Sequence, residues 1–378
     1  MESIILTNAI IFTGEAQLTD HALWMENGKI KAVLPTSEIP QGENIRDMQG
    51  AWLVPGFIDF QLYGGDSGFL TRDGSVESLD NMYRTHLSDG TTTIVPTVYS
   101  TTKERILAAI AAVEEYWKQG RLGVAGLHVE GPFLNPIKRG AHSDKMVRPP
   151  SHEEIEELLE KGKDVVKVLT IAPECFDDSL LELLKQSNWA IAAGHTNATS
   201  AELNTYFDKG FNLITHLYNA MRPLESRELG VVGTVFDRDD VHASIIVDGH
   251  HCEFGAVRIA KKLLGDRLFL ISDATFAKYQ GTRFEFEGFT INYNGERFLN
   301  DDGLLAGSCI TLLDAVRNCI RKVGISPEET FRMASAYPAR HLGMNHQIGY
   351  LKPGFLANVV ALSPDLALQQ VWAEGQTV

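Results

Sequence analysis

Two short runs of sequence, WAIAAGHT (residues 189–196) and NLITHLYN (residues 212–219), decide the fold of this chain. In each run an apolar stretch leads into a histidine, His195 or His216, which is typical of a buried strand that leads into a functional loop. Six further runs share this apolar, β-branched character, and most of the gaps between the runs carry helical periodicity. The six are WLVPGFIDF (52–60), TTTIVPTVY (91–99), GVAGLHVEG (123–131), VVKVLTIAP (165–173), VHASIIVDG (241–249) and RLFLISDAT (267–275).

Strands that alternate with helices and are apolar on both faces predict a parallel sheet covered by helices. Eight is also the number of strands that closes a (β/α)8 barrel, so we predict an α/β fold of the TIM-barrel type rather than an open doubly wound sheet. No G-x-G-x-x-G or G-x-x-x-x-G-K-[ST] motif follows any of the runs. The main evidence for a nucleotide-binding open sheet is therefore missing.

The two ends of the chain have a different character. IILTNAIIFTG (4–14) and ALWMENGKIKAVL (22–34) predict short strands, and Asn27-Gly28 is a strong hairpin signal. IGYLKPGFLANVVAL (348–362) returns to the same pattern near the other end. We predict a small β domain built from residues 1–52 and 343–378, with the barrel in residues 53–342.

One gap interrupts the barrel pattern. After the eighth run, residues 283–303 alternate apolar and polar side chains and contain Asn294-Gly295. This predicts a β-hairpin insertion. It is expected to overhang the barrel mouth as a lid or wall, with an oligomer contact as the alternative role.

Composition limits the class of protein. The chain has 34 basic and 49 acidic residues, a net charge of −15, which argues against nucleic acid or an anionic membrane surface as a partner. No segment approaches the ~20 apolar residues of a membrane span, and the first residues lack the features of a signal peptide. The cysteines are scattered, as expected for a reduced, cytoplasmic protein; they are Cys175, Cys252, Cys309 and Cys319.

Ionisable residues gather where the predicted strands end. In a barrel of this type the loops after the strands build the active site, so these residues are expected to lie on one face. They are His128 and Glu130 after the third run, His195 after the fifth, His216 after the sixth, Asp248, His250 and His251 after the seventh, and Asp273 after the eighth.

Glu130, His195 and His216 are the predicted metal ligands. A single histidine that closes an apolar strand is more often a hydrogen-bonded structural residue, but several strands that converge on one face change this interpretation. One glutamate and two histidines with an open position are a common set for a catalytic divalent ion, with zinc favoured. His128 is interpreted as a residue of the core or a partner of the ligands.

Asp273 is the predicted proton shuttle. It closes the last strand, across the barrel mouth from the third, where a carboxylate could take a proton from an attacking water and give it to the leaving group. The alternatives are a fourth metal ligand or the N-cap of a helix.

With these residues assembled, the chain resembles the amidohydrolase superfamily over essentially its whole length. HVEGPF (128–133) and THLYNAM (215–221) resemble the group that deacetylates 6-phosphorylated N-acetylamino sugars, whereas PGFID (55–59) marks only the superfamily. The remaining stretches that carry the resemblance are GHTNATSAE (194–202), VDGHH (247–251), ISDAT (271–275) and LLAGS (304–308). The resemblance implies hydrolysis of the acetamide of N-acetylglucosamine 6-phosphate to glucosamine 6-phosphate and acetate, in amino-sugar catabolism.

The resemblance also implies individual roles. Asp273 would act as general base and acid, and His142 would hydrogen-bond the substrate and stabilise the oxyanion. Arg227 and His251 would hold the phosphate, with Arg227 reaching across the interface of a homodimer or dimer-based oligomer. The other residues expected to contact the substrate are Gln61, Ala141, Asn219, Ala220, Leu305, Ala306 and Gly307.

One departure from the superfamily bears on the number of metals. Many amidohydrolases carry H-x-H at the end of the first strand, but this chain has Gln61-Leu62-Tyr63, and no lysine ends the fourth strand. We therefore predict one divalent metal per subunit, with Gln61 near the phosphate or an ordered water. Because nucleobase deaminases and cyclic amidases usually keep the H-x-H, those activities are disfavoured.

Two alternative functions stay open at this stage. The first is the same reaction on N-acetylgalactosamine 6-phosphate, since no residue can be identified that recognises the C4 hydroxyl. The second is a non-catalytic scaffold of the same fold that acts through oligomerisation. The presence of Glu130, His195, His216 and Asp273 together argues against the second.

Overall fold

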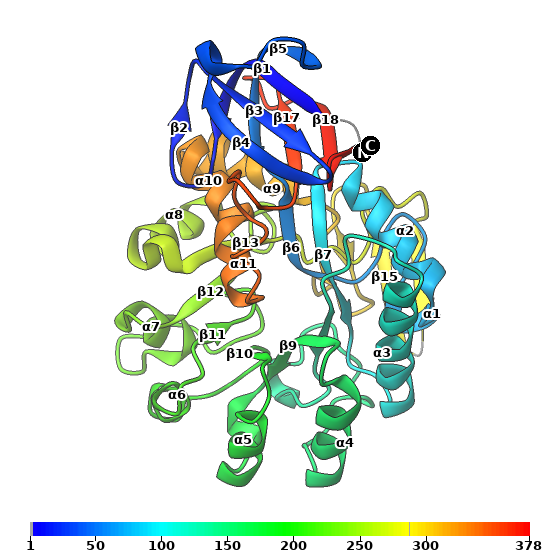
Figure 1. Ribbon diagram of the computed structural model, residues 1–378. Coiled ribbons are helices and arrows are strands. Elements are labelled where there is room, and N and C mark those ends of the chain that lie inside the picture. The colour runs from blue at the N-terminus through cyan, green and yellow to red at the C-terminus, as the bar shows by residue number, and fades with distance from the viewer. Residues whose placement is uncertain (1–2, 287) are drawn as a thin grey trace.

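A nearly closed barrel of eight parallel strands dominates the computed structural model, which describes residues 3–286 and 288–378 (Figure 1). Neighbours in the barrel are neighbours in the sequence, as predicted. The strands are β6 (Phe57–Leu62), β7 (Thr91–Val98), β8 (Leu127–Glu130), β9 (Val166–Ile171), β10 (Ala190–Ala193), β11 (Leu213–Ile214), β12 (His242–Ile246) and β13 (Leu268–Ile271).

The first and last strands meet just beyond the end of β13. The backbone N–H of Asp273 donates to the carbonyl of Gln61 at 2.9 Å, and the N–H of Tyr63 donates to the carbonyl of Ala274 at 2.8 Å. These bonds bring the residues after β6 and β13 side by side. The predicted barrel is confirmed, and its closure lies at the candidate active site.

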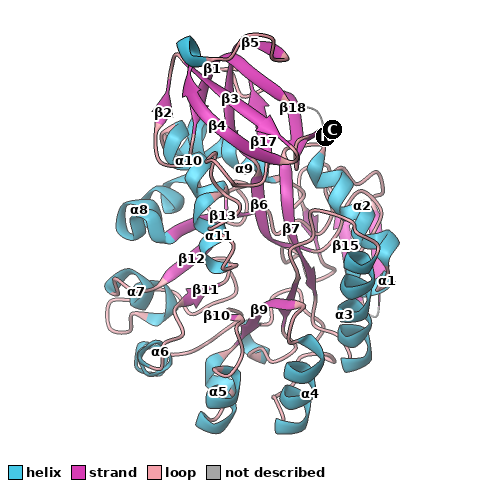
Figure 2. Cartoon of the chain, in the orientation of Figure 1, coloured by secondary structure: helices cyan, strands magenta, loops and turns pink. Residues whose placement is uncertain are grey.

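Helices surround the barrel, as Figure 2 shows. Between the strands lie α1 (Leu70–Asp73), α2 (Val76–Leu87), α3 (Lys103–Lys118), α4 (His152–Gly162), α5 (Asp178–Leu184), α6 (Ser200–Asp208), α7 (Gly230–Asp237) and α8 (Phe254–Leu264). After the barrel come α9 (Leu312–Asn318), α10 (Pro327–Ala334) and α11 (Ala336–His341). Because helices cover the outer face and side chains fill the interior, the strands are buried on both faces, which explains their continuous apolar runs. No helix in the described ranges has both the length and the apolar character needed to cross a membrane.

A second sheet combines strands from both ends of the chain. Its path is β19-β18-β17-β5-β1-β3-β4, with β2 paired to β1. The strands are β1 (Ile4–Phe12), β2 (Gln17–Leu18), β3 (His21–Glu26), β4 (Lys29–Pro35), β5 (Ile45–Pro55), β17 (Val359–Leu362), β18 (Leu368–Ala373) and β19 (Gln376–Thr377). β17 near the end of the chain pairs with β5 near its beginning, as Figure 1 shows, so the small sheet domain built from both termini is confirmed.

The turn between β3 and β4 has the geometry its sequence predicts. Asn27 and Gly28 have φ of 50° and 78°, the positive values that a tight hairpin turn of this type requires.

An aromatic cluster joins the small sheet to the barrel. Phe331 on α10 lies 5.0 Å from Phe12 on β1 and 6.2 Å from Trp52 on β5, measured between ring centroids. Phe331 and Phe12 are buried and Trp52 is partly buried. Edge-to-face rings at these separations add attraction to the hydrophobic burial.

We expect Phe331→Ala to destabilise the protein by about 3–5 kcal/mol, because the lost ring leaves a cavity between the two parts of the fold. Urea unfolding of the purified variant measures this loss. The control is Ile259→Ala on α8, where the side chain is 55% exposed and the expected change is within about 0.5 kcal/mol. A loss below about 1 kcal/mol for Phe331→Ala would contradict a structural role for the cluster.

The insertion after the eighth strand is a three-stranded antiparallel sheet rather than a simple hairpin. Its strands are β14 (Arg283–Phe286), β15 (Phe289–Tyr293) and β16 (Phe298–Leu299); residue 287, within the predicted hairpin, lies outside the described residues. Phe284 packs against Phe69 at 5.0 Å and Phe276 at 5.0 Å, next to the barrel mouth. The backbone N–H of Ala306 donates to the carbonyl of Phe298 at 3.2 Å. The insertion therefore supports the segment that carries Leu305, Ala306 and Gly307.

Candidate active site

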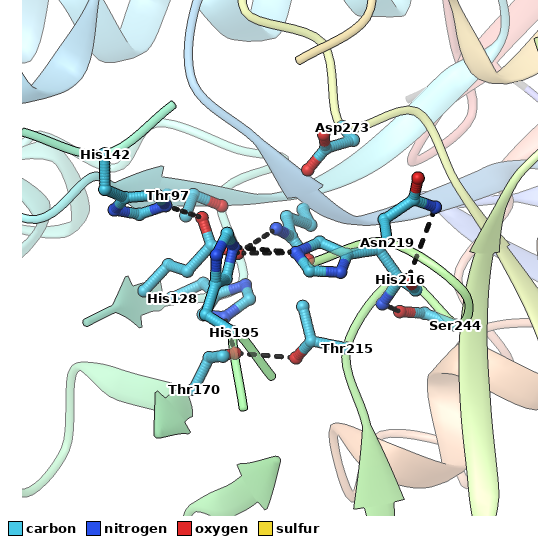
Figure 3. A network of polar contacts seen from close by, with 12 residues as sticks. Thr97, His128, His142, Thr170, His195, Thr215, His216, Asn219, Ser244 and Asp273 are labelled. Carbon is cyan, nitrogen blue, oxygen red and sulfur yellow. Dashed lines mark hydrogen bonds and ion pairs between the residues drawn. The ribbon is translucent and has the colours of Figure 1, made fainter. Parts of the chain in front are cut away.

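The predicted site residues stand at the ends of different barrel strands. Glu130 is the last residue of β8, and His195, His216 and Asp273 each lie two residues beyond the end of β10, β11 and β13. The backbones of these last three have positive φ, of 49°, 35° and 53°. This left-handed conformation is uncommon outside glycine and clusters at functional sites. Figure 3 shows His142 and Asp273 near the His195–His216 pair on different sides.

Three donor atoms of this group converge. Nε2 of His216 lies 3.1 Å from Oε1 of Glu130 and 3.0 Å from Nε2 of His195, and the third separation, from His195 Nε2 to Glu130 Oε1, is 3.4 Å. Ligands bound tetrahedrally at ~2.0–2.1 Å stand about 3.3 Å from one another. All three side chains are buried. The spacing and the chemistry of the donors therefore fit one divalent metal ion.

The protonation states favour the same interpretation. Nδ1 of His195 must donate to the carbonyl of Lys138 at 3.0 Å, so Nε2 is the ring nitrogen that could bind a metal at the centre. Burial lowers the pKa of His216 and so favours the neutral imidazole that a ligand requires. Burial by itself raises the pKa of Glu130, but the surrounding histidines hold it well below its usual range. Glu130 is therefore an anion.

Two residues of β6 and the following loop hold the Glu130 carboxylate. Nε2 of Gln61 donates to Oε1 at 2.8 Å, and the hydroxyl of Tyr63 donates to Oε2 in a short hydrogen bond. Nε2 of Gln61 also lies 2.9 Å from the Tyr63 oxygen. Gln61 is buried and does not line the cavity, so the structure does not bring it to the substrate wall where it was expected. Its amide supports a candidate metal ligand instead.

Asp273 borders the centre on the side of β6. Its Oδ1 lies 3.1 Å from the Tyr63 oxygen, and its side chain is buried but reaches the cavity. Burial raises the pKa of Asp273 well above the usual range, and the nearby charge of Glu130 adds to the effect. A carboxyl group in this setting is suited to hold and release a proton.

His142 lies on the long loop after β8. Its ring stacks on Tyr99 at 4.0 Å, Nδ1 lies 2.7 Å from the hydroxyl of Ser100, and Nε2 lies 3.5 Å from Oε2 of Glu130. Burial lowers its pKa to about 4, so the ring is neutral near pH 7. A neutral imidazole held in this way can donate one hydrogen bond into the cavity.

A cavity of about 510 Å³ opens above these residues. It is the size of a small-molecule pocket, and the mixture of apolar wall and few polar groups is typical of one. Its lining includes Ala141, His142, His195, His216, Asn219, Ala220, His251, Asp273, Leu305, Ala306 and Gly307, all of which the sequence predicted as site residues.

Arg227 lies apart from the other predicted site residues. It is exposed in the loop between β11 and α7 and does not line this cavity. Its role stays a prediction.

The wall residues that sequence reasoning did not assign to the site include Tyr63, Tyr99, Lys138 and Arg139. Tyr63 and Tyr99 follow β6 and β7, so the strand-end rule that found the histidines could have found them. Tyr63 was weighed only as a replacement for a histidine ligand. Lys138 and Arg139 lie on the loop after β8, where no strand end marks them. Nη1 of Arg139 is bound to the carbonyl of His142 at 2.7 Å.

Comparison with known proteins gives a consistent assignment. Residues 52–378 match the amidohydrolase family, and residues 5–53 match the NagA composite domain. The chain is 36% identical over 364 residues to the N-acetylglucosamine-6-phosphate deacetylase of Haemophilus influenzae, covering 95% of each chain. It is 32% identical to the N-acetylgalactosamine-6-phosphate deacetylase of Escherichia coli O157:H7, covering 97% of each.

Solved structures agree over the whole chain. The N-acetylglucosamine-6-phosphate deacetylase of Pasteurella multocida superposes with a TM-score of 0.95 at 34% identity, covering 100% of this chain and 99% of that one. A mutant of the Mycobacterium smegmatis enzyme, in complex with N-acetyl-D-glucosamine 6-phosphate, gives a TM-score of 0.92 at 28% identity, with 100% and 99% covered. On the family match, the shared fold and the convergent site, this chain belongs to the amidohydrolase family.

Proposed function

We propose that the protein hydrolyses the acetamide of N-acetyl-D-glucosamine 6-phosphate, giving D-glucosamine 6-phosphate and acetate. The observation that carries the proposal is the buried Glu130–His195–His216 set, which lies beside Asp273 where a cavity of about 510 Å³ opens. The relatives named as deacetylases of this substrate, from bacteria to Bos taurus and Homo sapiens, support it.

Glu130, His195 and His216 would hold one divalent metal, with zinc favoured by the nitrogen and carboxylate donors. When bound, such an ion supplies polarisation of the acetamide carbonyl and a lowered pKa for water. Gln61 and Tyr63 keep the Glu130 carboxylate in place through the hydrogen bonds already described.

The chain's own residues move the proton and receive the charge. Asp273 takes the proton of the attacking water and delivers it to the amine nitrogen as the C–N bond breaks. With Nδ1 of His142 accepting from Ser100, Nε2–H is left to donate to the carbonyl oxygen as negative charge develops there.

The cavity wall holds the sugar and its phosphate. Asn219 offers an amide, and Gly307, at φ +69°, lets the backbone lie against Thr275, where a Cβ would come within 2.1 Å of the threonine hydroxyl. Ala141, Ala220, Leu305 and Ala306 complete the surface.

His251 binds the phosphate from within the subunit, and Arg227 serves the cavity of a second copy in a homodimer. Arg227 is suited to this because it is exposed and lies outside its own cavity. We also propose a cytoplasmic location, in keeping with four cysteines that are all free.

The test is acetate release from N-acetylglucosamine 6-phosphate by the purified protein. We expect zinc-reconstituted protein to release acetate, with little release from unphosphorylated N-acetylglucosamine. N-acetylgalactosamine 6-phosphate is assayed beside it, because a relative of this chain is named for that substrate. A higher kcat/KM for the galactosamine isomer would replace the proposed substrate, and no release from either sugar by a folded, metal-loaded protein would contradict the proposal.

A further inference from the structure

Asp248 and His251 form a closed pair in the loop after β12. Oδ1 of Asp248 accepts the backbone N–H groups of His250 and His251, both at 2.8 Å. The other oxygen, Oδ2, lies 2.7 Å from Nδ1 of His251. The side chains of Asp248 and His251 are only 4% and 7% exposed, and His251 lines the cavity. The carboxylate therefore shapes the turn with one oxygen and orients the imidazole with the other.

The pairing determines which proton His251 carries. Burial raises the pKa of Asp248, but its bonds to His251 and to the backbone amides leave that pKa below its usual value, so Asp248 is an anion. An ionised carboxylate only accepts hydrogen bonds, so Nδ1 of His251 must be the donor. In a neutral ring, Nε2 would then carry a lone pair.

The oxygens of a phosphate dianion, the form that prevails above about pH 6, also only accept hydrogen bonds. A neutral His251 with Nδ1–H directed at Asp248 would place its Nε2 lone pair against the phosphate, which is repulsive. The ring can serve both partners at once only as an imidazolium, with a proton on each nitrogen.

We propose that Asp248 is a positioning residue that holds His251 as an imidazolium, so that recognition of the substrate phosphate is linked to the uptake of one proton. This inference rests on the proposed function, since it takes His251 as the phosphate contact. Recognition of the phosphate is therefore expected to weaken as the pH rises.

Other titratable and charged groups lie near the pair. Asp273 after β13 and Cys309 before α9 lie close enough to feel the charge of Asp248, as does Cys252 in the same loop. Lys138 and Arg139 share the cavity and oppose a positive ring. Among the described residues, Asp248 is the carboxylate hydrogen-bonded to His251.

Asp248→Asn separates the two duties of the carboxylate. The amide oxygen of asparagine can still accept the two backbone N–H groups, so the turn is kept. The amide nitrogen would then donate to Nδ1 of His251, and a neutral ring would present Nε2–H to the phosphate. The variant keeps a hydrogen bond but loses the charge and the need for a proton.

The experiment measures KM and kcat from about pH 6 to pH 9 in wild type, Asp248→Asn, His251→Ala and the double variant. At low pH we expect Asp248→Asn to raise KM for the phosphorylated substrate about tenfold, the difference between a charged and a neutral hydrogen bond, with kcat within about threefold. We expect the KM of the wild type to rise with pH and the KM of Asp248→Asn to rise less. The double variant matches His251→Ala, because Asp248 acts through the ring.

Two controls make the result specific. The second ionisation of the substrate phosphate, near pH 6, is the same in every assay. A difference in the pH dependence of KM between variants therefore comes from the protein. Asp177→Asn makes the same change at the N-cap of α5, where Oδ1 accepts the N–H of Leu180 at 2.9 Å, and it is expected to keep wild-type KM.

If the wild-type protein is active and Asp248→Asn has the same KM with the same pH dependence, this inference is wrong while the proposed function stands. A loss confined to kcat would also contradict the inference. A wild-type protein that releases no acetate would instead overturn the proposed function.

Discussion

Asp273→Asn is expected to lower kcat for acetate release by about 10²–10⁴-fold, the range associated with loss of a positioned acid or base. Asparagine has nearly the same size and can still pair with the Tyr63 hydroxyl, which lies 3.1 Å from Oδ1 in the wild type. It cannot take a proton from water. Glu130, His195 and His216 are unchanged, so the metal content should also be unchanged.

The measurement combines steady-state acetate release with metal analysis of the same sample. Asp266→Asn is the control, because Asp266 lies on the surface before β13 with its side chain 63% exposed. We expect that variant to have wild-type kcat. If Asp273→Asn keeps kcat within threefold, Asp273 is not the proton shuttle; if it loses the metal, Asp273 is a ligand, the alternative left open by the sequence.

The sequence predicted the convergence of the site because it depends on topology. Glu130 and His216 are 86 positions apart, yet both close parallel strands of one barrel and therefore share a face. Eight apolar runs with histidines or carboxylates at several of their ends were enough to place the site before any side chain was positioned.

The hydrogen bonds that hold the candidate metal ligands could not be predicted from the sequence, because they depend on the directions of individual side chains on different strands. Gln61 was expected near the substrate, but its amide turns to Glu130, two strands away in the barrel. Tyr63 was noted only as a poor replacement for histidine, and its bond to Glu130 requires knowledge of both rotamers. Arg227 shows another limit: an exposed loop residue whose proposed partner belongs to a second copy has no signature within one chain.

The insertion after β13 shows that a turn motif in the sequence can predict one hairpin of a sheet without predicting the whole sheet. Asn294-Gly295 was the signal for a hairpin, and these residues do connect β15 (Phe289–Tyr293) to β16 (Phe298–Leu299). The additional strand β14 (Arg283–Phe286) pairs with β15 through its alternating residues, a pairing that no two-residue turn motif announced. The fold class could therefore be predicted while the strand count of the insertion could not.

Removal of the metal is expected to have the other largest effect. Chelation should lower activity by roughly 10³-fold or more, since the several kcal/mol that a bound ion contributes to the transition state are lost. Adding one equivalent of zinc per subunit should restore activity. His216→Ala should bind metal weakly and stay inactive, because it removes one of three donors that lie 3.0–3.4 Å apart.

We expect one equivalent of metal rather than two because of the side chains that lie beside Glu130. In the place where many amidohydrolases carry two imidazoles, this chain has the amide of Gln61 and the phenol of Tyr63, and both already donate to the Glu130 carboxylate. A second ion would have to displace these bonds. His128→Asn is the matched control for His216→Ala. His128 is a buried histidine on the same strand as Glu130, and its Nε2 lies 2.8 Å from the Thr170 hydroxyl. We expect this variant to keep one metal. Two tightly bound equivalents in the wild type would contradict the single-metal site, and full activity after exhaustive chelation would contradict a metal requirement altogether.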